Sequence, residues 1–304
     1  MADIDSIPMV VVHGGAGASK QDEDGCQAAA RAGLALLGEG QDALAAAVAA
    51  VVALEDDGRF NAGSGAVLCL DGCTVELDAA VMDTRGALGA VACLQRVKNP
   101  VLVARAVAGS PHWLLAGEGA ERFARTAGFA PHLAIGERAR ARHGLLMRRL
   151  QEAEAVLPGV DNAAFARHWN YPLLAAAPAG EAACDTVGAV ARDAQGHFAV
   201  ACSTGGSAPS LLGRVGDTPI IGSGFYAGPH GAVAVTGLGE HIVRHLLAFT
   251  VYQWIAQGLP LEQALRRGVD LFEPRIDVGL IAIGRGQAGS LSNRAMPVGQ
   301  AGHG

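Results

Sequence analysis

The segment Cys184-Asp185-Thr186-Val187-Gly188-Ala189-Val190 carries the strongest signal in this sequence. The Ala- and Pro-rich residues before it, about 155–185, predict a flexible connector, whereas residues 187–192 predict a buried strand. A connector therefore ends at the Asp185–Thr186 bond, where a strand begins. If this bond were cut, Thr186 would become an N-terminal residue. Its α-amine, with a pKa near 7.7–8.0, could then deprotonate its own hydroxyl.

A second hydroxyl group is predicted close to Thr186. Residues 187–192 and 197–203 form a predicted hairpin that turns at Asp193-Ala194-Gln195-Gly196. Ser203-Thr204-Gly205-Gly206 ends the partner strand. The hairpin therefore brings Thr204 toward the start of the first strand.

Two later motifs suit a small amino-acid substrate. Gly213-Arg214-Val215-Gly216-Asp217 places opposite charges three residues apart. Arg214 suits an α-carboxylate and Asp217 an α-ammonium group, and a surface ion pair is the simpler alternative. Thr236-Gly237-Leu238-Gly239 lies between a predicted strand and a predicted helix. A hydroxyl and amide N–H groups at such a junction suit an oxyanion hole.

The rest of the chain predicts strands in hairpins and helices in separate pairs, which indicates an α+β fold with helices outside packed sheets. An Asp71-Gly72 turn predicts a hairpin between residues 66–70 and 74–82. Further strands are expected at 9–12, 88–97, 219–223, 232–236 and 278–283. Helices are expected at 24–37, 41–55, 100–108, 112–127, 239–256 and 260–272, with an arginine-rich helix around 138–149.

Composition excludes several classes of protein. The 304 residues are 50% hydrophobic, which argues against disorder, and the net charge of −6 with 5% aromatic residues argues against a nucleic-acid partner. The longest uncharged apolar run, residues 43–54, is too short for a bilayer, which needs about 20 residues. Acidic residues at positions 1–5 do not fit a signal peptide, and six cysteines without a leader indicate reduced thiols. We expect a cytoplasmic protein with no membrane partner.

Four other patterns have ordinary interpretations. Gly284-Arg285-Gly286-Gln287-Ala288-Gly289 has the letters of a dinucleotide fingerprint, but no acidic residue follows it, so we reject it. His241 and His245 have a spacing that can bind metal, and a polar helix face is the favoured alternative. Cys69 and Cys73 lack a second pair to complete a zinc site. His13 is expected to be a structural histidine in a glycine loop close to the site.

In combination and order, the motifs resemble the plant-type L-asparaginase, or isoaspartyl peptidase, family of N-terminal-nucleophile threonine hydrolases. Glycosylasparaginase and threonine aspartase are related to this family. The resemblance covers most of the chain outside residues 132–184. Besides the motifs quoted above, it rests on His13-Gly14-Gly15-Ala16-Gly17, Phe60-Asn61-Ala62-Gly63, Glu76-Leu77-Asp78-Ala79, Val97-Lys98-Asn99-Pro100, Gly117-Glu118-Gly119-Ala120-Glu121 and Gly279-Leu280-Ile281.

The resemblance implies a fold and a processing step. The fold would be a four-layer αββα sandwich spanning residues 1–304 as one domain. Self-cleavage between Asp185 and Thr186 would give an α chain, residues 1–185, and a β chain, residues 186–304. The family also implies a homodimer of αβ units.

Roles for individual residues follow from the same resemblance. Thr186 would be the nucleophile, Thr204 would tune it, and Thr236 with the Gly237 amide would stabilise the oxyanion. Arg214, Asp217 and Gly239 would hold the substrate, and Asn61 would position groups for catalysis and self-cleavage. The turn 54–64 resembles a loop that wraps a structural sodium ion, and no other cofactor is expected. Its ligands would be the backbone carbonyls of Leu54, Glu55, Asp57, Phe60, Ala62 and Ser64.

The implied activity is hydrolysis of the side-chain amide of L-asparagine and of β-aspartyl dipeptides through a β-aspartyl-enzyme intermediate. Two departures leave the substrate open. Asp185 stands where asparaginases of this family commonly have Gly, and Ser207-Ala208-Pro209-Ser210 replaces a more polar stretch. The alternatives are an N4-(β-N-acetylglucosaminyl)-L-asparaginase and a homologue that never cleaves itself and binds an amino acid or a partner protein.

Overall fold

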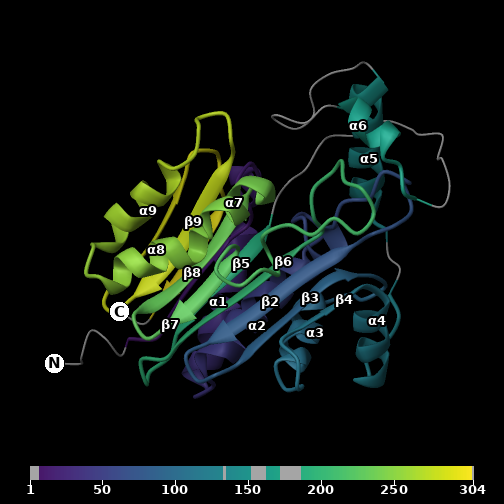
Figure 1. Cartoon of the computed structure of the whole chain (residues 1–304). Coiled ribbons are helices and arrows are strands. Elements are labelled where there is room, and N and C mark those ends of the chain that lie inside the picture. Colours follow the sequence, from purple (N-terminus) through teal and green to yellow (C-terminus); the bar gives the residue numbers. More distant parts are fainter. Residues whose placement is uncertain (1–6, 133–134, 152–161, 172–185, 303–304) are drawn as a thin grey trace.

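Strand β5 (Val187–Arg192) begins directly after Thr186 and lies inside a mostly antiparallel sheet. The computed structural model describes residues 7–132, 135–151, 162–171 and 186–302. Within these residues the larger sheet has seven strands in the order β11-β1-β5-β6-β2-β3-β4, and a second sheet has four strands in the order β10-β9-β8-β7 (Figure 1). The chain therefore has the mixed α+β architecture predicted from its sequence.

The strands are β1 (Met9–His13), β2 (Leu77–Asp83), β3 (Leu88–Leu94), β4 (Leu114–Ala116), β5 (Val187–Arg192), β6 (Phe198–Thr204), β7 (Phe225–Gly228), β8 (Gly231–Gly237), β9 (Val278–Gly284), β10 (Ala288–Ser292) and β11 (Val298–Gly302). The helices are α1 (Glu23–Gly38), α2 (Ala43–Asp56), α3 (Pro100–Val107), α4 (Gly117–Thr126), α5 (Glu137–Gln151), α6 (Asn162–Arg167), α7 (Gly239–His245), α8 (Leu247–Ala256) and α9 (Leu261–Val269).

The two sheets pack against each other through alternating strand residues. On β1, Val11 faces the second sheet, whereas Val10 and Val12 face the helices, because successive side chains of a strand point to opposite faces. Val11 lies in a core with residues of β5, β6, β7, β8 and β9. This core holds β5 and β6 of the larger sheet against β8 and β9 of the smaller sheet.

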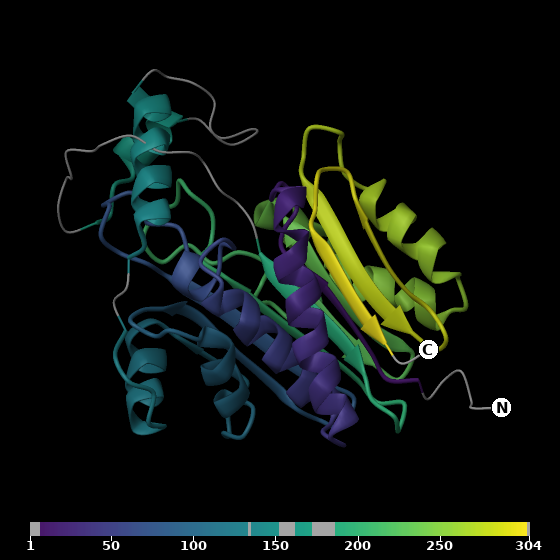
Figure 2. The ribbon, with the colours of Figure 1, turned by 180° about the vertical axis from the view of Figure 1, so that it is seen from behind.

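Helices cover the outer face of each sheet. Figure 2 shows α1 and α2 side by side across the larger sheet, and α8 and α9 lie on the smaller sheet. The Asp42 side chain caps α2 by accepting a hydrogen bond from the Ala45 amide at 2.8 Å. Gly33 lets α1 approach α2, since a Cβ there would lie 2.8 Å from the Ala46 carbonyl. Small residues thus produce the close helix pairing.

Helices α5 and α6 lie together at one end of the molecule (Figures 1 and 2). Leu146 of α5 and Phe165 of α6 pack with Val67, Leu70 and Tyr171 in a separate small core. The arginine-rich helix is confirmed as α5. Helix α6 was not predicted, because this region was taken as connector. Most of the predicted connector lies outside the described residues.

Several predicted elements were wrong in detail. Residues 66–70 form no strand, and the turn at Asp71-Gly72 is held instead by the Asp71 carboxylate, which accepts from the Cys73 and Thr74 amides. The segment 112–127 begins with strand β4 before helix α4. Of the predicted strand 219–223, only an isolated bridge from Ile221 to Phe225 is present.

Two further differences concern the C-terminal part. The predicted helix 239–256 is broken at Leu246, whose φ of 44° is left-handed. Strands β10 and β11 were not predicted, and β11 pairs with β1. None of the helices among the described residues is both long and apolar enough to pass through a bilayer.

Candidate active site

Thr186 lies directly before β5, where the larger sheet packs against the smaller one. It is only 4% exposed and precedes β5, whose Val187 pairs with Ser203 of β6. The register therefore places Thr186 beside Thr204, as the predicted hairpin required. Asp185 lies outside the described residues.

A small cavity of about 10 Å³ brings most of the predicted site residues together. The predicted residues that line it are Thr186, Thr204, Arg214, Asp217 and Gly237. Gly206, Gly216 and Thr218 complete the lining. The space holds about one water molecule. Segments far apart in the sequence thus converge on the Thr186 hydroxyl.

Thr218 is a site residue that the sequence analysis missed. Its Oγ1 lies 3.5 Å from Thr186 Oγ1, and the side chain is only 1% exposed. The signal was its position directly after Asp217, at the end of a motif already assigned to the site.

Thr236 lies behind Thr186 and accepts two hydrogen bonds. Its Oγ1 accepts from the Thr186 amide at 3.4 Å and from the Ala16 amide at 3.1 Å. A hydroxyl oxygen has two lone pairs and one proton. With both lone pairs used by amides, the Thr236 proton can be directed at another acceptor, as an oxyanion hole requires. The Ala16 contact also confirms that the glycine loop after β1 reaches the site.

Gly237 and Gly239 are required by backbone geometry and close packing. Gly237 has a φ of 137°, and a Cβ there would collide with the Asp277 carbonyl. At Gly239 a Cβ would lie 2.9 Å from Asp217 Oδ1 and 3.0 Å from Arg214 Nη2. Gly239 therefore lies against both charged residues of the predicted substrate clamp.

Arg214 forms its ion pair with Glu240, a residue that the sequence analysis did not assign to the site. Arg214 Nε donates to Glu240 Oε1 at 2.9 Å, and Nη2 donates to Oε2 at 2.8 Å. Burial raises the pKa of Glu240, but the hydrogen bonds and charge of Arg214 outweigh this effect and lower it. Glu240 is therefore an ionised carboxylate in the position expected for a bound anion.

Asp217 is fully enclosed, and its Oδ2 makes no hydrogen bond within the described part of the chain. Burial raises its pKa to about 7, opposed by its own backbone amide and by Arg214. The carboxylates of Glu240 and Asp78 raise it further. Burial also raises the pKa of Asp78 to about 6. A ligand with an ammonium group would supply the missing partner of Asp217.

Asn61 positions the turn after β6 and does not line the small cavity. Its Nδ2 donates to the Gly206 carbonyl at 2.7 Å, and its carbonyl accepts from the Gly205 amide at 2.9 Å. Its Oδ1 accepts from the Val67 amide at 2.9 Å. Asn61 thus fixes the chain that carries Thr204.

His13 is buried between the sheets, with its ring over Gly188. Desolvation lowers its pKa to about 3, and an approach to the Thr186 backbone opposes this shift. Neither ring nitrogen completes a hydrogen bond of good geometry among the described residues. His13 is therefore neutral at pH 7, as suits the predicted structural role.

The predicted sodium loop, residues 54–64, begins in the last turn of α2 and continues into a tightly folded turn. The Phe60 carbonyl accepts from the Ala62 amide at 2.9 Å, and the Ala62 carbonyl accepts from the Gly65 amide at 3.0 Å. A Cβ on Gly63 would lie 2.7 Å from the Glu55 carbonyl and 2.8 Å from the Lys98 carbonyl. Backbone carbonyls converge on this turn, and oxygen ligands of this kind fit a hard cation.

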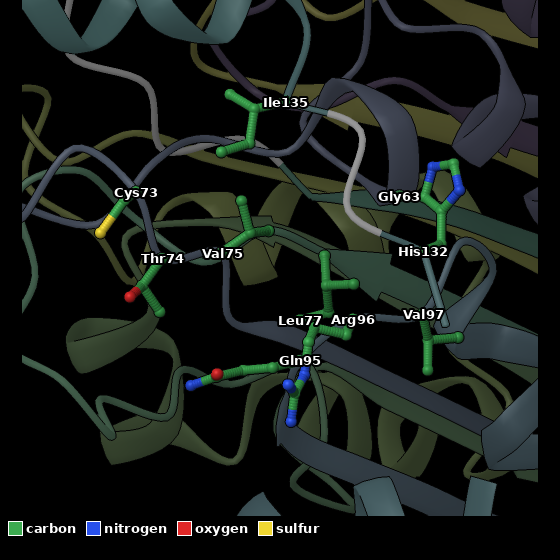
Figure 3. Close-up of a pocket in the computed structure, with 10 residues that line it drawn as sticks. All are labelled: Gly63, Cys73, Thr74, Val75, Leu77, Gln95, Arg96, Val97, His132 and Ile135. Carbon is green, nitrogen blue, oxygen red and sulfur yellow. The ribbon is translucent and has the colours of Figure 1, made fainter. Parts of the chain in front are cut away.

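Other candidate sites take no part in this arrangement. No cluster of three His, Cys, Asp or Glu side chains suited to a metal occurs among the described residues, so His241 and His245 have no third ligand there. A separate cavity of about 260 Å³ is lined by Thr74, Gln95 and His132 among others (Figure 3). It contains none of the residues predicted for catalysis or substrate binding.

Comparisons with known proteins identify the family of this chain. The family model Asparaginase_2, described as asparaginase, matches residues 6–298. A protein named plant-type L-asparaginase from Pyrococcus abyssi (strain GE5 / Orsay) is 38% identical, with 93% of this chain and 92% of the relative covered. Proteins named isoaspartyl peptidase/L-asparaginase are 37% identical in Xenopus laevis, covering 88% of this chain and 82% of the relative, and 36% identical in Mus musculus, covering 90% and 81%. The chain therefore belongs to the asparaginase family that its motifs resemble.

Proposed function

We propose that this protein is a threonine amidohydrolase that cuts itself before Thr186 and then hydrolyses L-asparagine and β-aspartyl dipeptides. The observation that carries the proposal is the small cavity at which Thr186 meets Thr204, Arg214, Asp217 and Gly237. The names of the relatives, L-asparaginase and isoaspartyl peptidase, support the choice of substrates.

Self-cleavage uses the Thr186 hydroxyl. The oxygen attacks the Asp185 carbonyl carbon, the peptide C–N bond breaks, and an ester to Thr186 forms. Water then hydrolyses the ester, which leaves a carboxylate on Asp185 and a free α-amine on Thr186. We assign the Asp185 carboxylate as the local base from its place in the sequence. The products are the α chain, residues 1–185, and the β chain, residues 186–304.

Substrate hydrolysis uses the same hydroxyl a second time. The α-amine accepts its proton, and the oxygen attacks the side-chain amide carbon of the substrate. The Thr236 hydroxyl and the Gly237 amide stabilise the oxyanion, and losing one such donor costs on the order of 10²–10³ in rate. The C–N bond breaks, the amine leaves with the proton, and water releases aspartate from the β-aspartyl ester. Thr204 orients the nucleophile.

Substrate binding pairs opposite charges. The α-ammonium group binds the Asp217 carboxylate, whose Oδ2 lacks a partner among the described residues. The α-carboxylate binds Arg214 in competition with Glu240. Gly239 leaves room between the two charged side chains.

The proposal extends to the architecture. The packed helices and sheets are assigned as the αββα sandwich of N-terminal-nucleophile hydrolases, with the mature protein a dimer of αβ units. The carbonyls of Leu54, Glu55, Asp57, Phe60, Ala62 and Ser64 would hold sodium, which would stiffen the turn that carries Asn61. A higher melting temperature in NaCl than in choline chloride of equal ionic strength tests the ion, and light scattering tests the dimer.

Release of ammonia from L-asparagine, and of leucine from β-aspartyl-leucine, tests the activity. Wild-type protein should hydrolyse both, Thr186→Ser should act more slowly, and Thr186→Ala should be inactive. Arg214→Ala should raise KM strongly and leave self-cleavage intact, whereas loss of processing would make Arg214 structural. Preferred turnover of N4-(β-N-acetylglucosaminyl)-L-asparagine would favour the glycosylasparaginase alternative. Saturable asparagine binding by an uncut, inactive chain would favour the binding-protein alternative.

A further inference from the structure

A larger cavity opens beside the small one. Its volume is about 670 Å³, which lies in the range of 300–1,000 Å³ typical of small-molecule sites. Arg214 lines both cavities. Gly237 lines the small cavity and the next residue, Leu238, lines the large one. The larger cavity is therefore the outward continuation of the site that holds Thr186.

The inner wall of this outer cavity is mainly apolar. Pro209 and Leu238 are buried, and Leu211 and Leu212 are half-buried, although all four line the cavity. Phe165 of α6 contributes a further apolar side chain. Leu211 packs in none of the hydrophobic cores of the described residues, so its side chain is available to a ligand.

One face of α7 supplies the charge of the outer cavity. Glu240, His241 and Arg244 all line it. Glu240 is paired with Arg214. Arg244 is exposed, and no hydrogen bond or ion pair to it is formed by the residues that the structure describes. Within the described part of the chain, the rim thus presents Arg244 as an unpaired cation to a ligand in the cavity.

We propose that the outer cavity binds the leaving group of a β-aspartyl dipeptide, with a preference for a leaving amino acid that has an apolar side chain and a free α-carboxylate. This inference rests on the proposed function. The Arg214–Asp217 clamp fixes the aspartyl part, so the amine side of the scissile bond extends into the outer cavity. The apolar wall takes the side chain, and Arg244 takes the carboxylate. Ammonia, the leaving group of asparagine, uses none of this wall.

The test compares kcat/KM for a series of leaving groups. The substrates are L-asparagine, β-aspartyl-glycine, β-aspartyl-leucine and β-aspartyl-leucinamide. For wild-type enzyme, we expect kcat/KM for the leucine peptide to be about tenfold higher than for the glycine peptide. The reason is that burying part of a leucine side chain contributes about 1–2 kcal/mol. The kcat/KM for β-aspartyl-leucine should be about fivefold higher than for β-aspartyl-leucinamide, which is the size of effect expected of a partly exposed ion pair.

Two variants assign these preferences to residues. Arg244→Gln should abolish the difference between acid and amide and lower the ratio of kcat/KM for β-aspartyl-leucine over asparagine by about fivefold. Leu211→Asn should lower the ratio of leucine over glycine peptide by about fivefold. Arg105→Gln, a change of an exposed arginine in the last turn of α3, is the matched control and should alter no ratio.

The possible outcomes are distinguishable. Equal kcat/KM for the leucine, glycine and amide peptides, with asparagine still hydrolysed, would overturn the leaving-group site and leave the proposed function standing. Variants that lower kcat/KM for every substrate by the same factor would also overturn the leaving-group site. Failure to hydrolyse asparagine and all peptides would remove the proposed function itself.

Discussion

At the scale of single residues, the Thr186 hydroxyl lies beside other hydroxyl groups, in a cavity that the Asp217 carboxylate also lines. Thr218 Oγ1 lies 3.5 Å from Thr186 Oγ1, and Thr204 lines the same cavity. His13 lies close by but is neutral, because burial lowers its pKa to about 3. Among the described residues, no His, Asp or Glu side chain is hydrogen-bonded to the Thr186 hydroxyl, which agrees with an α-amine that provides the base only after cleavage.

Thr218 is expected to orient the nucleophile. Thr218→Val keeps the shape of the side chain and removes its hydroxyl. We expect kcat to fall on the order of tenfold to a hundredfold, because small displacements of reacting groups have costs of this size. The melting temperature should change little. Wild-type kcat in a correctly folded variant would show that the 3.5 Å contact has no role in the reaction.

Asp217 should make ligand binding depend on pH. Its pKa is raised to about 7 by burial, so it is largely neutral below pH 7 and ionised above it. An ammonium ligand needs the ionised form. Inhibition by L-aspartate should therefore strengthen between pH 6 and pH 8, by up to about tenfold for each pH unit below the pKa.

Succinate is the matched control for this experiment, since it lacks the ammonium group but keeps both carboxylates. Asp78, Glu240 and the Thr186 α-amine act on both inhibitors, whereas only L-aspartate should gain from ionised Asp217. Succinate inhibition should stay level or weaken as the pH rises. The same pH curve for both inhibitors would contradict the assignment of Asp217.

The sequence predicted most of the residues at the site because each lies in a short motif at the end of a strand or in a glycine turn. Thr186, Thr204 and Gly237 are of this kind. Glu240 could not be predicted in the same way, since its role comes from a partner 26 residues away in the chain. Thr218 was missed because a threonine after a charged motif has no distinctive pattern.

At the scale of elements, helix α2 ends in a buried acid. The Val101 amide donates to Glu55 Oε1 at 3.0 Å. Burial raises the pKa of Glu55 from 4.5 to about 8, opposed by the nearby Ser203 hydroxyl, the hydrogen bond from the Val101 amide and the nearby Asn99 side chain. Glu55 is therefore protonated in the folded protein at neutral pH and ionised in the unfolded chain.

Glu55→Gln should change how stability depends on pH. Between pH 4.5 and 8 the folded state holds one proton more than the unfolded state at Glu55. The free energy of unfolding contributed by this group therefore falls by about 1.4 kcal/mol per pH unit as the pH rises. Urea unfolding at pH 5.5, 6.2 and 7.0 should show that slope as the difference between wild type and variant. Parallel curves would mean that Glu55 is ionised in the fold.

The break between α7 and α8 offers a test of backbone strain. Leu246 has a φ of 44°, a left-handed conformation that costs a non-glycine residue about 1–2 kcal/mol, and its side chain is 49% exposed. Leu246→Gly should raise the free energy of unfolding by about 0.5–1 kcal/mol after the added freedom of the unfolded glycine is subtracted. A melting temperature below that of wild type would show that the leucine side chain contributes more than the strain removes.

Elements with a clear hydrophobic period were predicted well, and those set by tertiary contacts were not. The pairs α1 with α2 and β5 with β6 follow from their local patterns. Strand β11 contains two glycines and a glutamine, and its place is set by pairing with β1. The break at Leu246 could not be predicted, because no Gly or Pro at this position indicates it in the sequence. Residues 66–70 look like a strand because they are apolar, but they pack against α5 as irregular chain.

At the scale of the whole molecule, the site lies where the two sheets meet, so neither sheet alone contains it. Thr186 and Thr204 come from the larger sheet, whereas Thr236 and Gly237 end strand β8 of the smaller one. The core around Val11 therefore does more than stabilise the fold, since it holds the strand that follows Thr186 against the strand that ends in Thr236 and Gly237. Family membership could be predicted from the sequence because motifs from both sheets appear in the family order.

The proposed activity depends most on cleavage of the chain immediately before Thr186. Mass spectrometry under denaturing conditions, with N-terminal sequencing, should be applied to the same preparation that releases ammonia from L-asparagine. We predict two fragments, one of which begins at Thr186, and a single uncut chain for Thr186→Ala. Full activity in a preparation that consists only of intact 304-residue chain would contradict the central claim.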